Sequence, residues 1–102
     1  MLRSALGLAL LSITVVGCQD EFEEECSAFC PEGPSACPQG EVDCTKDCAE
    51  IARSADEYGC RPESVAYSKC VAAEDVCAQE APPACTDEYG AFYGCLEAQG
   101  GQ

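Results

Sequence analysis

The chain has 102 residues but no histidine and no tryptophan, and only five lysines and arginines stand against 19 acids. Without histidine, a Ser–His base pair is excluded, and zinc binding loses its commonest nitrogen ligand. The negative charge opposes binding to nucleic acid and to anionic lipid headgroups. We therefore expect no nucleic-acid partner, no metal and no cofactor.

A membrane-spanning run of about 20 apolar residues is also absent. The longest apolar run, Ala5–Val16, follows Arg3 and the free amino terminus. This length and order are typical of the h-region of an export signal, so residues 1–17 are predicted to be a signal peptide. The other interpretation is a short buried helix, but no other segment is apolar enough to pack around it.

Cys18 ends this segment, and it makes the cysteine count an odd 11. The residues Val15-Val16-Gly17-Cys18 resemble a bacterial lipobox. The resemblance implies that diacylglycerol is attached to the Cys18 thiol and that signal peptidase II cleaves before it. Removing this cysteine leaves ten, an even number. The alternative is a secreted protein with a free thiol.

The residues after Cys18 bear on location. In enterobacterial lipoproteins an Asp directly after the lipidated cysteine retains the protein at the inner membrane, so Gln19 implies delivery to the outer membrane. Asp20-Glu21 resembles a surface-export signal of other lineages, or is only a solvated spacer. We expect an exported protein whose partner is the bacterial membrane, reached through the lipid on Cys18, at the outer membrane or cell surface.

Large aliphatic side chains are scarce beyond the signal. A mature chain from Cys18 has 85 residues and a formal charge of 4 − 19 = −15. A domain with so little core depends on covalent support, and ten cysteines at this density indicate a disulfide scaffold. Each bridge contributes about 2–4 kcal/mol to stability. The six large aliphatic residues are Val42, Ile51, Val65, Val71, Val76 and Leu96.

The pattern of apolar, capping and helix-breaking residues predicts an all-α bundle of three to four short helices and no strand. The helices are expected over 21–30, from Thr45 as N-cap to Tyr58, from Pro62 to Cys70 or Cys77, and from Thr86 as cap to Gln99. Gly59 is placed to end the second helix. Residues 18–25 are expected to form an acidic tether, 26–99 the cysteine-rich domain and 100–102 a tail.

A weak repeat relates Cys60–Cys70 to Cys85–Cys95. Both segments have a cysteine, then glutamate three residues after it, an aromatic residue seven residues after it and a second cysteine ten residues after it. These offsets share one helical face, which predicts two similar helices packed together and joined by sulfur.

The cysteine spacing favours helical hairpins. Two cysteines four positions apart share a helix face, and each reaches a neighbouring helix. Pro82-Pro83 leaves a second arrangement open, with Cys77–Cys85 and Cys70–Cys95. Antiparallel hairpins predict Cys26–Cys48, Cys30–Cys44, Cys60–Cys95 and Cys70–Cys85, which leaves Cys37 with Cys77.

The paired C-x3-C and C-x9-C spacings are similar to those of the twin-CX3C and twin-CX9C helical-hairpin proteins of the mitochondrial intermembrane space. The layout of Cys18–Cys95 resembles small cysteine-rich lipoproteins predicted from myxobacterial genomes, most of which have no known activity. Both resemblances concern layout, so they imply class and location and no catalytic role.

The chemistry-bearing residues favour binding or a structural role over catalysis. There is no C-x2-C redox motif, and no calcium-binding loop. Tyr89 and Tyr93 lie one turn apart, off the cysteine seam, and form a possible binding surface, unless they pack on the first two helices. Glu63 and Glu88 fall on the seam and either point outward or bond helix-start amides. The alternatives are a small envelope thiol-redox protein or other enzyme, and a loose divalent-cation binder.

Overall fold

The computed structural model describes residues 21–100, so the predicted signal peptide and Cys18 lie outside the described residues. The predicted helical, disulfide-stapled fold is confirmed. In chain order the elements are α2 (Glu21–Ser27), β1 (Ser35–Cys37), β2 (Gly40–Val42), α3 (Cys44–Asp56), α4 (Arg61–Glu74), the 3-10 turn η1 (Pro83–Cys85) and α5 (Thr86–Gln99).

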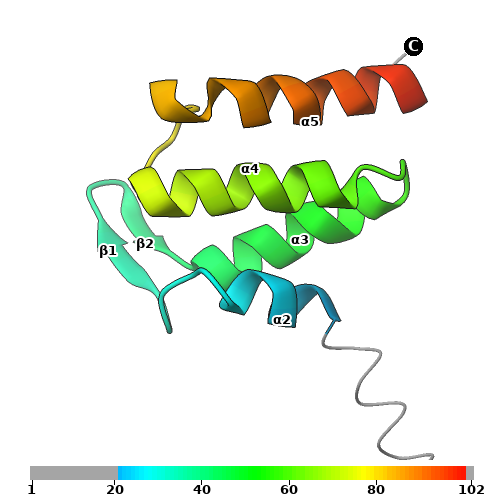
Figure 1. Ribbon diagram of the computed structural model, residues 1–102. Coiled ribbons are helices and arrows are strands. Elements are labelled where there is room, and N and C mark those ends of the chain that lie inside the picture. Colours follow the sequence, from blue (N-terminus) through cyan, green and yellow to red (C-terminus); the bar gives the residue numbers. More distant parts are fainter. Residues whose placement is uncertain (1–20, 101–102) are drawn as a thin grey trace, which may run out of the picture.

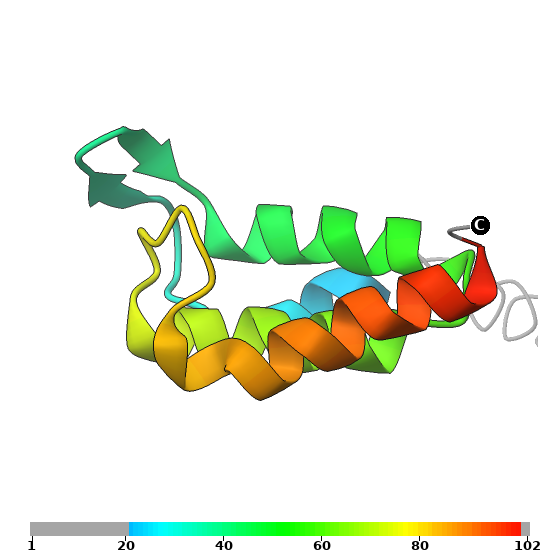
Figure 2. The ribbon, with the colours of Figure 1, turned by 90° about the horizontal axis from the view of Figure 1, so that it is seen from above.

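The helices form a short stack with α4 in the middle. Helix α4 packs against α3 on one side and α5 on the other, and α2 lies mainly against α3 (Figure 1). The β-hairpin projects at the end of α3 where that helix begins. In Figure 2 it lies beside the segment that joins α4 to α5. Consecutive helices are therefore neighbours, as short connections favour.

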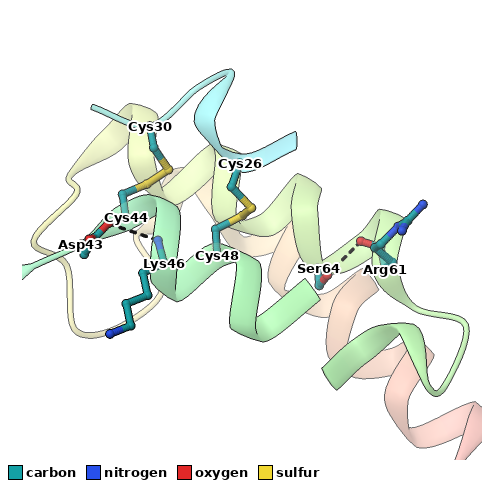
Figure 3. Close-up of a disulfide and its surroundings, with 8 residues drawn as sticks. All are labelled: Cys26, Cys30, Asp43, Cys44, Lys46, Cys48, Arg61 and Ser64. Carbon is teal, nitrogen blue, oxygen red and sulfur yellow. Dashed lines mark hydrogen bonds between the residues drawn. A yellow bond between two sulfur atoms is a disulfide. The ribbon is translucent and has the colours of Figure 1, made fainter. Parts of the chain in front are cut away.

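Five disulfides hold this stack together, and they are the same five pairs that antiparallel hairpins predict. In Figure 3 the two cysteines of the α2 region point toward Cys44 and Cys48 of α3. The alternative pairs, Cys77–Cys85 and Cys70–Cys95, do not occur. The bridges are Cys26–Cys48, Cys30–Cys44, Cys37–Cys77, Cys60–Cys95 and Cys70–Cys85.

Helix α3 packs closely because its buried face carries only small side chains. The spacing of these residues places them on one stripe, and the absence of bulk lets α2 and α4 approach. The helix begins one residue earlier than Thr45, because the Asp43 carboxylate Oδ1 accepts a hydrogen bond from the Lys46 N–H at 3.1 Å. The predicted Thr45 cap is therefore wrong, and Asp43 is the cap. The buried residues are Cys44, Cys48, Ala49, Ala52 and Ala55.

Helix α3 ends at Asp56, two residues before the predicted Tyr58, and Gly59 completes the turn that follows it. Its φ of +73° is in the left-handed region, and the following N–H, of Cys60, donates to the Ala55 carbonyl at 3.0 Å. This turn reverses the chain, so that α4 runs back along α3. Side chains other than glycine adopt such a φ at a cost.

Gly59→Ala is expected to lower the unfolding free energy by about 1–2 kcal/mol, the cost of a left-handed conformation for a residue with a Cβ. Gly90→Ala is the matched control, because neither new methyl group meets a heavy atom within 4 Å and Gly90 lies inside α5. Alanine there is expected to stabilise by about 0.5–1 kcal/mol. Urea unfolding of the oxidised protein measures both; equal effects at the two positions would contradict the assignment.

The repeat is visible in three dimensions in α4 and α5. Tyr67 and Phe92 are the aromatic residues seven positions after the first cysteine of each repeat, and they stack with ring centroids 6.1 Å apart. Phe92 is buried with Ala55 and Cys60, and Tyr67, Cys95 and Leu96 pack against this cluster. The predicted seam of aromatic rings and sulfur therefore forms the core.

Three predicted helix boundaries need correction. Pro62 is the second residue of α4, after Arg61, whereas the end of α4 at Glu74 falls within the predicted range of Cys70 to Cys77. Thr86 is the first residue of α5 and does not cap it; its hydroxyl donates to the Pro83 carbonyl at 2.8 Å. The first helix ends at Ser27 and not at Cys30. Each error is a shift of one to three residues, which local sequence preferences do not resolve.

The acidic residues that precede Cys26 are not a free tether. Glu21–Glu25 belong to α2, and the Arg61 Nη1 donates to the Glu21 Oε2 at 2.8 Å. The Arg61 guanidinium also lies 5.1 Å from the Phe22 ring centroid, and that of Arg53 lies 5.3 Å from it. The described part of the helical fold therefore begins at Glu21, five residues before the predicted domain boundary at Cys26, and residues 18–20 of the predicted tether lie outside the described residues.

The β-hairpin was not predicted. Its strands pair antiparallel with Cys37 opposite Gly40, and each has only three residues, too few to show an alternating pattern. The hairpin is attached to the rest of the fold by the Cys37–Cys77 bridge and by the Gln39 amide, which donates to the Cys77 carbonyl at 3.0 Å. Tertiary bonds thus stabilise strands that would be marginal alone.

Candidate functional site

A groove lies between the faces of α3 and α4, closed at one end by β2 and by the segment that follows α4. Its volume is about 340 Å³. Val42 of the hairpin and Ile51 of α3 face Val71 of α4 and Val76 of the following segment, with Tyr67 on the wall. The groove therefore has a largely aliphatic lining supplied by four parts of the chain.

The distribution of aliphatic residues is unusual. The described chain has six leucine, isoleucine and valine residues, and four of them line this groove. Ile51 is 40% exposed. The buried core consists of cysteine, alanine and Phe92, with one buried serine. Because aliphatic side chains gain free energy by leaving water, their collection in an open groove makes this groove the candidate binding surface of the described residues.

Disulfides shape the groove. The Cys37–Cys77 bridge joins the hairpin to the segment after α4, so that both close the same end. That segment is itself ordered by Asp75, whose Oδ1 accepts from the Cys77 N–H at 3.0 Å. On the α3 side, Cys44 and Cys48 line the groove while their sulfurs bond to the α2 region. The lining is therefore set by covalent bonds rather than by a large core.

The predicted pair Tyr89 and Tyr93 lies on the surface of α5. The rings are 42% and 46% exposed, and their centroids are 4.6 Å apart. Tyr89 also meets Tyr67 of α4 edge-on, with centroids 5.6 Å apart. The tyrosine pair therefore packs partly on α4, whereas the alternative expected from the sequence was packing on the first two helices.

Tyr67 connects the two surfaces, because it lines the groove and contacts Tyr89. Burial raises the pKa of its phenol, and the neighbouring Tyr93 and Tyr89 raise it further. The phenol therefore stays neutral and keeps its proton as a hydrogen-bond donor. Sequence reasoning missed Tyr67 as a site residue. The signal that could have identified Tyr67 was its place in the repeat, seven residues after the first cysteine, where the other repeat has Phe92.

The two repeated glutamates do not bond helix-start amides. Glu63 and Glu88 each have one carboxylate oxygen, Oε1, that is buried without a hydrogen-bond partner. A Glu63 oxygen lies within 4.8 Å of the sulfurs of Cys60 and Cys95. Those sulfurs form a disulfide and supply no thiolate, so this group is not a metal centre in the oxidised protein.

The part of the chain that was predicted to meet the membrane, residues 1–17 with Cys18, lies outside the described residues. Within residues 21–100, no helix is both long enough and apolar enough to cross a membrane. The five disulfides fit a protein of the cell envelope or the extracellular space, where thiols are oxidised.

Comparison of the chain with protein-family models, with curated proteins and with solved structures finds no match in any of the three.

Proposed function

We propose that this protein is a non-catalytic binding module of the bacterial cell envelope, anchored by lipid on Cys18, whose groove takes an apolar ligand. The observation that carries the proposal is the groove itself, lined by four of the six described aliphatic residues. A domain with so few aliphatic residues would gain most from burying them in its core. Their partial exposure therefore lowers the stability of the free protein. A bound apolar ligand would cover these side chains and recover that free energy.

The chemistry of the remaining residues supports binding over catalysis. All ten cysteines of the described part are in disulfides, which leaves no thiolate there for exchange. The chain has no histidine to act as a base near neutral pH. The alternatives of an envelope thiol-redox protein and of a divalent-cation binder have no comparable observation in their favour.

The lipid anchor rests on the four lipobox residues and on cysteine parity. Five bridges use ten cysteines of residues 21–100, and Cys18 is the eleventh. Two or more acyl chains on Cys18 would hold the protein stably at a membrane. Gln19 supports the outer membrane or the cell surface as the location.

A neutral environment-sensitive fluorophore, N-phenyl-1-naphthylamine, tests the groove. We expect saturable binding with a blue-shifted emission. Val71→Ser is expected to weaken it about fourfold, since a lost methyl-sized contact is worth about 0.8 kcal/mol. Val65→Ser is the matched control, because Val65 lies on the same helix and is also half-buried but does not line the groove. Equal affinities in the two variants would contradict binding in the groove.

A further inference from the structure

The charges around the groove are of one sign. Among its lining residues only Asp47 of α3 and Glu80 of the segment after α4 carry acidic side chains, and both are exposed. No lysine or arginine lines it. The aliphatic lining of the groove is therefore accompanied by two carboxylates, and no positively charged residue lines the groove with them.

The basic residues of the described chain are placed elsewhere. Arg53 and Arg61 lie against the Phe22 ring of α2, and Arg61 also pairs with Glu21. Lys46 borders a separate hollow near the α2–α3 connection, and Lys69 is exposed on α4 outside the groove. None of these four positive side chains lines the groove, so the negative charge of its lining residues is not compensated within the groove.

The size of the groove limits its occupant. A volume of about 340 Å³ is at the lower end of the 300–1,000 Å³ that is typical of small-molecule sites. The wall also presents the Tyr67 ring. Aromatic faces attract organic cations, including quaternary ammonium groups.

We propose that the groove binds a small organic cation with an apolar body. The body lies against Val42, Ile51, Val71 and Val76, and the cationic group lies at the rim, near Asp47 and Glu80. Organic anions of the same shape are disfavoured by both carboxylates and by the net charge of the protein. This inference rests on the proposed binding function and specifies the chemistry of its ligand.

Three probes with the same eight-carbon chain separate charge from apolar contact: octyltrimethylammonium, 1-octanol and octanoate. Each is titrated into the oxidised protein, the two ionic probes below their micelle concentrations and 1-octanol below its solubility limit, and amide shifts are followed by ¹H–¹⁵N NMR. We expect shifts at Val42, Ile51, Val71 and Val76. The cation is expected to bind about threefold to tenfold more tightly than the alcohol, as two exposed charge pairs allow. Octanoate is expected to bind most weakly.

The double variant Asp47→Asn with Glu80→Gln is expected to abolish the preference for the cation while keeping the binding of octanol. The control double variant, Glu24→Gln with Glu57→Gln, removes the same charge from exposed acids that do not line the groove. It is expected to keep the preference. Both variants are accepted only if their amide spectra show the native fold.

The outcomes distinguish this inference from the proposed function. If octanol binds in the groove as tightly as the cation, or if the preference survives in the Asp47→Asn/Glu80→Gln variant, the cation inference is overturned and the apolar groove stands. If none of the three probes shifts the groove amides, the proposed function itself is overturned.

Discussion

Reduction of the five disulfides is expected to abolish the helical circular-dichroism signal of this protein at room temperature. Each bridge contributes about 2–4 kcal/mol, so five together match or exceed the 5–15 kcal/mol that is typical of a whole domain. The remaining core is Phe92 and a set of small residues. A reduced and alkylated protein that kept most of its helix would contradict this dependence.

Two of the bridges are expected to contribute differently to stability although they close similar lengths of chain. Cys60–Cys95 spans 35 residues and Cys37–Cys77 spans 40, so loop entropy gives about 4 kcal/mol for both. Cys60, however, is fully buried beside Phe92, whereas the Cys37–Cys77 bridge attaches a peripheral hairpin.

The double variant Cys60→Ala with Cys95→Ala is therefore expected to lose about 4 kcal/mol or more. The variant Cys37→Ala with Cys77→Ala is expected to lose about half as much, because the hairpin can detach while the helices stay packed. Urea unfolding followed by circular dichroism gives both values. Equal losses would show that loop entropy alone decides the contribution of a bridge. The second variant is also expected to weaken the groove, because its closed end depends on this bridge.

Wild-type protein expressed in a bacterium is expected in the membrane fraction as a processed, lipidated chain, because acyl chains provide the anchor at about 0.8 kcal/mol for each buried methylene. Cys18→Ser has no thiol for the lipid and no cleavage point for signal peptidase II, so it is expected to appear on the immunoblot as a larger, unlipidated precursor that keeps its signal peptide. Gly17→Ala is the control, since it keeps a small residue before the cysteine and is expected to leave the protein membrane-bound. Fractionation followed by immunoblotting measures the distribution. Soluble wild-type protein would refute the anchor.

The intact mass of the membrane-extracted protein tests the lipid anchor and the five disulfides together. We expect a chain that starts at Cys18, carries a lipid increment, and gains ten hydrogens on reduction, two for each of the five bridges. A mature start at another residue excludes lipidation at Cys18. A smaller hydrogen gain means that at least one of the five bridges is absent from the cellular protein.

Much of the fold could be predicted because its determinants are local. The i, i+4 cysteines, Gly59 and the Pro82-Pro83 break mark helices and turns over a few residues. The repeat predicted that the helices of Cys60–Cys70 and Cys85–Cys95 pack together and are joined by sulfur, because its offsets place the repeated residues on one helical face. The errors were at boundaries, where Asp43 takes the cap that Thr45 was expected to form.

The candidate site was less predictable. Tyr89 and Tyr93 were predicted as a binding surface and are exposed. The groove was not predicted. Val42, Ile51, Val71 and Val76 look like core residues in a sequence short of core. Nothing in their spacing says that they line a surface, because they come from four separate parts of the chain.

The sequence by itself determined the helical class, the disulfide-scaffold character and the acidic charge of the protein. These follow from periodicity, spacing and composition, which do not depend on distant contacts. Only the tertiary structure decided that the hairpin forms, that Glu21–Glu25 join the domain, and that the aliphatic residues line an open groove beside Asp47 and Glu80. Those features depend on which side chains meet across bridges such as Cys37–Cys77, where the joined residues are 40 positions apart.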